Sequence, residues 1–522
     1  VLYLTRNGKE FPLEVSAPFQ ITEVTPRKVT GKATLKGGGL TFDIIATTEY
    51  DGFILYNLVC KSGWFSKDLD RLRLKMPLDG NYIKFLSASG DSSGVNIPAK
   101  VIPAGDGRIY DSMTDTRSVV MTPSFASLLW FGDHNVCFCY AADTDKDWIL
   151  HNDKPAVEAW RKGDVVDLYI NLIDKPAKLE KTHTMEFAFQ TGPTKPRPAN
   201  WREYHAILGA PDVPKYRVQI GGDGFTTNGG THSLHPGYTP ELRKKSKERI
   251  ESYEKRAEPG KVFVSGYQFW GHTVKGFPEA RVFRSEWGLN ADGWANYGVF
   301  DGHKWRTKTY GENREYYYRI PVAPAPSYVD FLTYAYDETL KVANIYGFYD
   351  DVGYPKPGFN PALGMGYVKD GVEYYSAGLW LYRKRWQEAA EINAKNKRLN
   401  LLGDTQHLNA HYMPAYAFIG VFAPCEQGYY NPYVFKDAFE FFGSLDKYAA
   451  ICPAKQTGQI PLIGLSSRRL EFGSFAQDTR AMFMLAALND HTLGSFGRRE
   501  EMTVARIDSA RAQFRQWEKD VT

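Results

Sequence analysis

The sequence predicts a two-part molecule, in which an antiparallel β-sandwich is followed by a (β/α)8 TIM-type barrel. Short alternating apolar and polar runs, separated by turn residues, fill the first 190 residues. A proline-rich segment follows, and beyond it β-rich runs alternate with long helical periods. The chain has 522 residues, which at the usual ~100–200 residues per domain suits two or three domains.

The expected sandwich covers residues 1–190. Its clearest strands have β-branched and aromatic residues at alternating positions and are bounded by Gly, Asp, Asn and Pro. This texture is typical of antiparallel sandwiches. These strands lie at 40–48, 53–59, 136–140 and 165–173.

A linker is expected at 191–204. Residues 191–198 include Pro193, Pro196 and Pro198. Proline locks φ and lacks a backbone N–H, so this spacing excludes a helix or a central strand and indicates a stiff connection.

The remaining residues, 205–522, read as the barrel. Strand and helix taken in turn indicate a parallel α/β fold, and a closed barrel is its commonest form at this size. Strands are expected at 216–221, 261–267, 281–285, 345–350, 398–402, 417–422 and 460–465. Helices are expected at 240–257, 328–342, 376–396, 434–446, 478–489 and 503–519.

Composition narrows the classes of partner. The 64 Lys and Arg exceed the 60 Asp and Glu by only four, so the chain lacks the dense basic field that binding to phosphate backbones requires. We therefore expect no nucleic-acid partner. No run of 18 apolar residues predicts a membrane span. Aromatic residues make up 15% of the chain, which suits stacking on sugar faces, and an oligosaccharide or polysaccharide is the expected partner.

No metal or cofactor is expected. The cysteines lack the CxxC spacing of zinc and redox sites, and Cys137 and Cys139 share one face of a strand as buried thiols. His407 and His411 lie four apart, but Pro414 argues against the helix that would align them as ligands. The five cysteines are Cys60, Cys137, Cys139, Cys425 and Cys452.

The chain begins with Val1 rather than Met. This start suits a processed product, and we expect an exported protein, periplasmic or extracellular, whose signal peptide has been removed.

The chemistry is expected at the carboxyl ends of barrel strands, where catalytic groups of this fold emerge. Asp350 and Asp351 follow the apolar run 345–349, and Glu426 follows the strand expected at 417–422. Cleavage of a glycosidic bond needs a carboxylic acid to protonate the leaving oxygen and a second carboxylate to stabilise or trap the cationic centre. Two adjacent carboxyls cannot both ionise freely, so one should stay protonated as the acid. The alternative is ordinary turn and capping chemistry.

Further residues are candidates for binding the sugar. They are an acid in a glycine turn, a second acid after an expected strand, aromatic platforms, and polar groups near the expected pocket. They comprise Asp223, Trp270, Glu286, Trp287, Tyr349, Arg383 and His407.

Several segments in this order resemble bacterial proteins related to glycoside hydrolase family 123, which has an N-terminal β-sandwich and a barrel catalytic domain. The resemblance covers most of the chain. It rests on residues 141–148 (AADTDKDW), the proline-rich 192–196, residues 346–351 (YGFYDD), Asp370-Gly371 before a helix with Arg383 and Arg385, a strand reaching His407, and residues 425–427.

The resemblance implies a substrate-assisted reaction on an N-acetylhexosamine. In that family a consecutive Asp-Glu pair works at a strand end: the Asp orients the attacking acetamido group and the Glu is the general acid. By position, Asp350 would be the orienting residue and Asp351 the acid. Aspartate is one methylene shorter than glutamate, so its carboxyl falls roughly 1 Å short of the same point. A glycosidase for a non-acetamido sugar, using the Asp pair with Glu426, is therefore the alternative within this class.

Two other classes of function stay open. A non-catalytic carbohydrate-binding relative would have buried, ion-paired carboxylates in place of an open acidic pocket. A polysaccharide lyase would need a Tyr or His base beside a cation that neutralises a uronate, and His407 with Arg383 could form that arrangement.

Overall fold

The computed structural model describes the first part of the chain almost throughout and the second part in pieces. For most strands of the second part the backbone is described and the side chains are not. The described residues are 1–60, 69–90, 99–179, 181–199, 201, 204–207, 216–220, 262–269, 271–274, 277–289, 319–341, 343–345, 347–351, 355–397, 404–405, 413–415, 417–418, 420–425, 443–453, 455–466 and 484–496, with single positions between 240 and 255.

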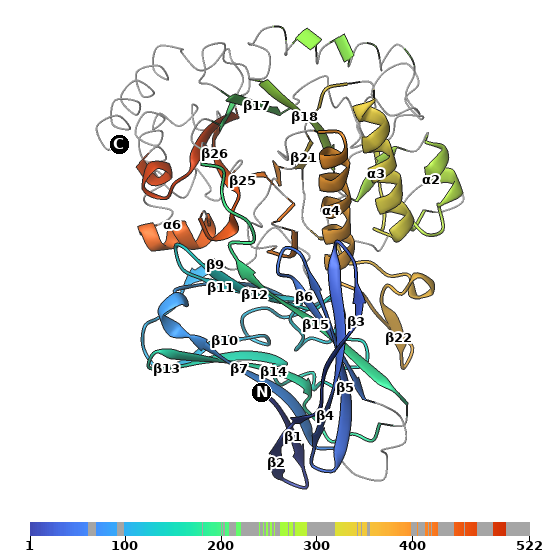
Figure 1. The fold of residues 1–522 in the computed structure, drawn as a ribbon, viewed down its shortest axis with the longest axis vertical. Helices are drawn as coiled ribbons and strands as arrows, with labels where there is room; N and C mark the ends of the chain where they lie inside the picture. Colours follow the sequence, from blue (N-terminus) through green and yellow to red (C-terminus); the bar gives the residue numbers. More distant parts are fainter. Residues whose placement is uncertain are drawn as a thin grey trace.

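Two large antiparallel sheets form the first part, as the alternating pattern predicts (Figure 1). The smaller has the order β10 (Gly107–Asp111), β13 (Val157–Lys162), β14 (Val165–Ile173), β7 (Arg71–Asp79), β1 (Leu2–Arg6), β2 (Lys9–Pro12). The larger has the order β3 (Glu14–Val24), β4 (Lys28–Gly37), β5 (Leu40–Glu49), β6 (Ile54–Cys60), β15 (His183–Gly192), β12 (Cys137–Ala141), β11 (Leu128–Gly132), β8 (Phe85–Ser89), β9 (Ala99–Val101).

Burial differs between the two sheets. In β13, Val157 and Ala159 are buried while Trp160 is 42% exposed, which is the alternation of a sheet with one wet face. In β11 and β8 every residue is buried. The centre of the larger sheet is thus covered on both faces, by the smaller sheet and by the second part of the chain. The thiols of Cys137 and Cys139 are buried here, as predicted.

Eight strands of the second part form one sheet in which every pairing is parallel. They follow each other in chain order, and the last pairs with the first; the two ends of the order, β24 and β25, also lie close together. The closed (β/α)8 barrel itself stays a prediction. The strands are β16 (Tyr204–Ile207), β17 (Tyr216–Ile220), β18 (Val262–Phe269), β21 (Phe348–Asp351), β24 (Asp404–Thr405), β25 (Val421–Cys425), β26 (Ile460–Ser466) and β27 (Thr492–Phe496).

Three described helices of the second part can be compared with the predictions from the sequence. Helices α3 (Pro326–Leu340) and α4 (Leu379–Lys395) confirm the helices predicted at 328–342 and 376–396. The strand predicted at 281–285 is wrong, because Pro278 occupies the first turn of a short helix, α2 (Pro278–Val282), and turns follow it. Among the described residues no helix is long and apolar enough to cross a membrane.

The strand predicted at 417–422 shifts toward the C-terminus, because β25 begins at Val421. Most of the helix predicted at 434–446 lies outside the described residues, and α6 (Leu445–Ile451) begins at its last two positions. The segments predicted at 398–402 and 503–519 also lie outside the described residues. Two short antiparallel sheets are described besides: β19 (His272–Val274) with β20 (Arg319–Pro321), and β22 (Tyr367–Lys369) with β23 (Val372–Tyr374).

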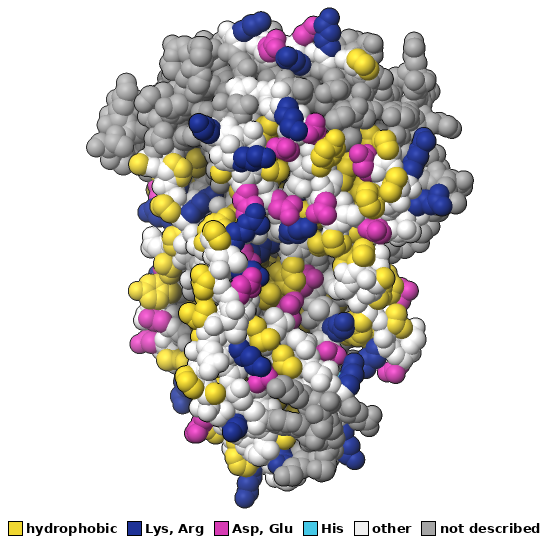
Figure 2. Space-filling view, turned by 45° about the vertical axis from the view of Figure 1, so that its right-hand side comes forward, with side chains coloured by type: hydrophobic (Ala, Val, Ile, Leu, Met, Phe, Trp, Pro, Cys, Tyr) yellow, Lys and Arg dark blue, Asp and Glu magenta, His cyan; other side chains and the backbone are white. Residues whose placement is uncertain are grey.

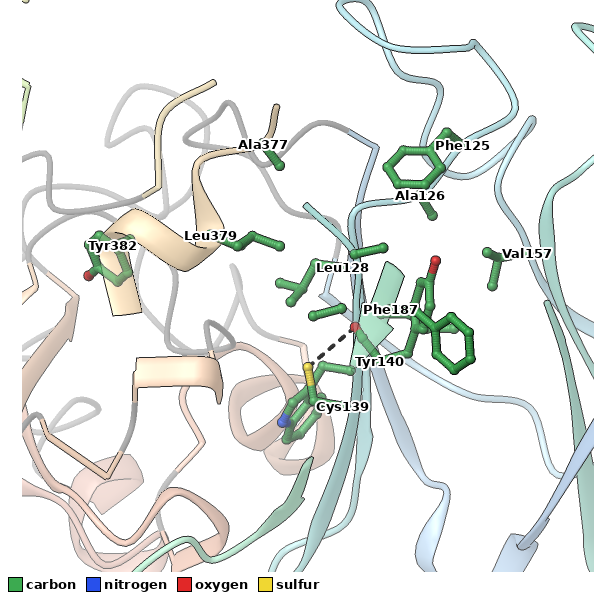
Figure 3. Packing of buried hydrophobic residues seen from close by; sticks show 14 of the residues in the cluster. Phe125, Ala126, Leu128, Cys139, Tyr140, Val157, Phe187, Ala377, Leu379 and Tyr382 are labelled. Carbon is green, nitrogen blue, oxygen red and sulfur yellow. Dashed lines mark hydrogen bonds between the residues drawn. The ribbon is translucent and has the colours of Figure 1, made fainter. Parts of the chain in front are cut away.

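An apolar and polar contact joins the two parts of the chain along α4. Figure 3 shows Leu379 of α4 pointing toward Leu128 of the larger sheet, and both belong, with Ala377, Tyr382 and Cys139, to one buried cluster. On the outside, charged side chains of both signs gather where the upper and lower parts of the molecule meet (Figure 2). This contact fixes the chain that follows β21 against the sandwich.

Candidate functional site

The predicted acid pair lies at the end of β21. The strand extends through Asp351, so both aspartates are its last two residues rather than the first residues of a loop. Asp350 pairs laterally with Gln268 on β18 and with Thr405 on β24. Since all eight strands are parallel, their carboxyl ends share one edge of the sheet, which is where such folds place catalytic residues. The structure therefore places the acid pair at the edge that the sequence predicts.

The strand before Glu426 lies near this pair. β25 ends at Cys425, so Glu426 directly follows it, just outside the described residues. β24 pairs with β21 and also contacts β25. Paired strands are ~4.8 Å apart, so in the closed barrel that the sequence predicts, where β24 and β25 would be neighbours, two such steps would span about 10 Å. The carboxyl groups of two-carboxylate glycosidases are separated by about 5–10 Å, a range that this spacing reaches.

Asp404 is a further acid at this edge that the sequence analysis missed. It lies in β24 beside Tyr349 of β21. The strand predicted at 398–402 ended too early to include it. The signal was an acid two residues beyond the apolar pair Leu401-Leu402, separated from it by a single glycine.

The chain between β21 and α4 is anchored to the sandwich. The Tyr367 hydroxyl on β22 donates to Asp145 Oδ1 over 3.0 Å. The backbone N–H of Tyr375 donates to the Val120 carbonyl over 3.0 Å, and that of Ala377 to the Asp143 carbonyl over 2.6 Å. The loop that follows the acid pair is thus anchored to residues 141–148, one of the segments that resemble the family.

Two buried carboxyls of the sandwich bind the start of α4. No side chain of its own N-cap, Gly378, can close the first turn; instead Asp143 Oδ1 accepts from the Leu379 N–H over 2.5 Å. Glu186 Oε1 accepts from the Trp380 ring N–H over 2.5 Å. Burial, reinforced by the charge of Glu186, raises the pKa of Asp143 from 3.8 to about 7, against the lowering effect of the backbone donors. Burial also raises the pKa of Glu186.

A pH dependence of stability follows from Asp143. Its folded pKa lies above its unfolded value, so the folded state binds the proton more tightly. The stabilisation is full below about pH 4 and is lost as the pH rises towards 7. Asp143→Asn keeps an oxygen for the Leu379 N–H and carries no charge. We expect its stability relative to wild type to increase between pH 5 and 8, by up to about 1.4 kcal/mol per pH unit in chemical denaturation.

Asp330→Asn is the matched control, because the Asp330 side chain is 66% exposed and its ion-pair partner, Lys384, stays charged over this range. Its difference from wild type should stay flat over the same range. A flat difference for Asp143→Asn as well would contradict the raised pKa.

Arg383, predicted to bind substrate, lies instead in the contact between the two parts. Its side chain is 4% exposed, and its two terminal nitrogens donate to both carboxylate oxygens of Asp51, over 2.8 and 2.9 Å. Glu49 lies 2.7 Å away, and the Pro414 carbonyl accepts from the same guanidinium. The guanidinium also lies over the ring of Phe53, 4.2 Å from its centroid. With these partners Arg383 joins α4 to the sandwich, which corrects the prediction of a sugar contact or of a cation in a lyase site.

Trp287 and Glu286 are also placed differently from the sequence prediction. The Trp287 ring is fully buried, stacks on Phe283, and donates to Ser327 Oγ over 3.0 Å. A ring with no exposed face cannot serve as a sugar platform, so Trp287 belongs to the core. Glu286 is half-buried and accepts from the Ser327 hydroxyl over 2.5 Å, which ties the turn after α2 to the first turn of α3.

The remaining candidates lie beyond what the structure describes, and their roles stay predictions. The side chain of Tyr349 is in this group, as are the whole residues Asp223, Trp270, His407 and Glu426. Within the described ranges, no three His, Cys, Asp or Glu residues lie close enough to hold a metal ion.

Comparisons with known proteins give structural likenesses only. No protein-family model matches the sequence, and no curated protein matches it. Among solved structures, a GH36 α-galactosidase from Geobacillus stearothermophilus in complex with raffinose has a TM-score of 0.46 at 10% identity, over 99% of this chain and 75% of that one. A xylosidase from Aspergillus niger has a TM-score of 0.40 at 8% identity, over 93% and 72%. The similar structures thus include glycoside hydrolases, and the likeness is one of general outline.

Proposed function

We propose that this protein is a glycoside hydrolase, and that its eight parallel strands close into a (β/α)8 barrel with the active site at their carboxyl edge. The observation that carries the proposal is the position of Asp350 and Asp351, the last two residues of a parallel strand. Its paired neighbour β24 also contacts β25, the strand that leads into Glu426. Carboxyl groups about 5–10 Å apart are what glycosidic cleavage requires.

The chemistry divides between the carboxyls. One of the set stays protonated and gives its proton to the leaving glycosidic oxygen. Another stays ionised and stabilises, or traps, the positive charge that develops on the sugar ring. Successive positions of a strand belong to opposite faces. Asp351 is the last residue of β21, so a turn directly after it would let both carboxyls reach one pocket, and Glu426 is the candidate third carboxylate.

The finer substrate follows from the resemblance to family 123. An N-acetylhexosamine would supply its own acetamido oxygen as the nucleophile, with Asp350 as the orienting residue. A non-acetamido sugar would need Glu426 as the third carboxyl instead. The two kinds of substrate can therefore be distinguished by whether cleavage requires Glu426.

The test is a screen of aryl glycosides, with and without a 2-acetamido group, using the wild type and Glu426→Gln. Turnover of at least one glycoside is expected. If the substrate is a non-acetamido sugar, Glu426→Gln should reduce kcat by about 10²-fold or more, the usual contribution of acid or base catalysis. If the reaction is substrate-assisted, the variant should retain most of its rate. Absence of turnover on aryl glycosides and natural glycans, together with retained glycan binding, would instead indicate the carbohydrate-binding relative.

A further inference from the structure

Two carboxyls of the sandwich lie opposite each other beneath the start of α4. β12 and β15 pair in a register that places Ala141, the last residue of β12, opposite Ala188. Two residues further along the same register, Asp143 comes opposite Glu186. Opposite residues of an antiparallel pair have Cβ atoms about 4.5–5.5 Å apart, and like charges at such positions repel each other. The charge of Glu186 acts on Asp143, as this placement requires, and raises its pKa.

Both carboxyls hold the first turn of α4. Asp143 Oδ1 accepts from the Leu379 N–H and Glu186 Oε1 from the ring N–H of Trp380, each over 2.5 Å. The Asp143 carbonyl accepts from the Ala377 N–H over 2.6 Å. The end of the loop between β21 and α4 therefore lies directly over the pair and withdraws both carboxyls from water.

The cations on the described elements around the pair contact other acids. Lys356, beside the N-cap of α4, has its ammonium near Gly271, and Lys146 is exposed. Asp145 is a further acid, and it accepts from the Tyr367 hydroxyl. Two ionised carboxyls would repel each other here, and one proton shared between them removes that repulsion. The cations that contact other groups are Lys181 with Asp147, Arg383 with Asp51, Lys384 with Asp330, and the His183 ring at the Asp147 carbonyl.

We propose that Asp143 and Glu186 form a proton-dependent latch, which holds the end of the loop 355–378 against the sandwich while the two carboxyls share one proton, and which weakens when both are ionised. The loop connects the acid strand β21 to α4, so the latch makes the docking of this loop sensitive to pH. The inference goes beyond the proposed function, because docking of the loop does not depend on what the protein binds or cleaves.

The direction of the pH effect follows from the difference between the docked and undocked loop. In the undocked loop Asp143 faces water, and its pKa is the ordinary value near 4. In the docked loop burial, together with the charge of Glu186, raises the pKa of Asp143 to about 7. The docked state thus holds one more proton between about pH 4 and 7. Docking should weaken by up to about tenfold per pH unit over that range and stay constant above it.

Hydrogen exchange, followed by mass spectrometry on peptides that cover residues 367–379, tests the latch without any substrate. Wild type and Asp143→Asn are compared at the same pH, which cancels the intrinsic pH dependence of exchange. Asparagine keeps an oxygen for the Leu379 N–H and carries no charge. The ratio of wild-type to variant exchange rates should rise by roughly tenfold per pH unit from pH 5 to 7 and level off above. Burial also raises the pKa of Asp145, but Asp145 is common to both proteins and its effect cancels in the ratio.

Two further variants and a reference strand complete the test. Glu186→Gln keeps an acceptor for the Trp380 ring and removes the repelling charge, so its exchange should level off at a lower pH than in wild type. Asp370→Asn changes an exposed acid of the β22–β23 turn in the same loop and should match wild type at every pH. Amides of β13 in the sandwich should exchange more slowly than the loop and show no such pH dependence.

A wild-type to Asp143→Asn ratio that stays flat from pH 5 to 8 would overturn the latch. Equal changes in the loop and in β13 would overturn it too, because the proton would then act on the whole fold. Should Asp143→Asn not fold, Glu186→Gln decides alone: an exchange profile identical to that of wild type would show that the two carboxyls do not share a proton.

Discussion

Replacing either aspartate at the end of β21 by asparagine is expected to abolish most turnover while leaving the fold intact. General acid catalysis is usually worth about 10²–10⁴-fold, so each change should reduce kcat by at least that much on a substrate with a poor leaving group. Asparagine has nearly the same shape as aspartate, and the backbone of β21 is held by its ladders to β18 and β24 on both sides. The measurement is kcat on a verified glycoside, beside a thermal unfolding curve for each variant.

The leaving group separates the two roles. A highly activated aryl leaving group needs little protonation, so a variant that lacks the acid should regain rate on it, whereas a variant that lacks the stabilising carboxylate should not. Wild-type rates in both variants would show that the pair is structural and that the active site lies elsewhere.

The β-sandwich of the first part was predictable from the sequence alone, because a strand with one solvent-exposed face has apolar and polar residues at alternating positions. β13 alternates buried and exposed positions along its length, and its strand was bounded by turn residues. β11 and β8 carry no such alternation, since both of their faces are covered. Their burial depends on contacts with residues far away in the chain, which no local pattern records.

The site was predictable in part, for a related physical reason. The apolar run before Asp350 marks a buried parallel strand, and an acid at the end of such a run is a local signal. The partners of Arg383 cannot be recognised from the residues around it in the sequence, because Asp51 and Glu49 lie more than 330 positions earlier in the chain. The family resemblance, which includes an arginine on the helix after the acid strand, suggested a sugar contact, although the Arg383 guanidinium serves the contact between the two parts.

Removing the Arg383 guanidinium should cost more stability than any other single change at the contact between the two parts. In Arg383→Met the aliphatic stem stays packed, but the Asp51 carboxylate, whose side chain is 1% exposed, loses both hydrogen bonds from its charged partner. It keeps neutral donors, the Gln190 amide at 2.9 Å and the Phe53 N–H at 3.3 Å. Breaking a buried ion pair by removing one partner typically costs 3–5 kcal/mol, because the remaining charge stays buried and uncompensated. We expect a loss of about that size in chemical denaturation at pH 7.

The exposed pair Arg27–Glu391 provides the matched control, because it also joins the sandwich to α4. The Arg27 side chain is 61% exposed, so solvent screens the pair and Arg27→Met should cost at most about 1 kcal/mol. Combining Asp51→Asn with Arg383→Met removes the stranded charge, and this double variant should recover part of the loss. If the buried and exposed variants are equally stable, or if Asp51→Asn brings no recovery, the Arg383 cluster does not hold the two parts together, and the loop after the acid pair must be anchored mainly by Asp143 and Asp145.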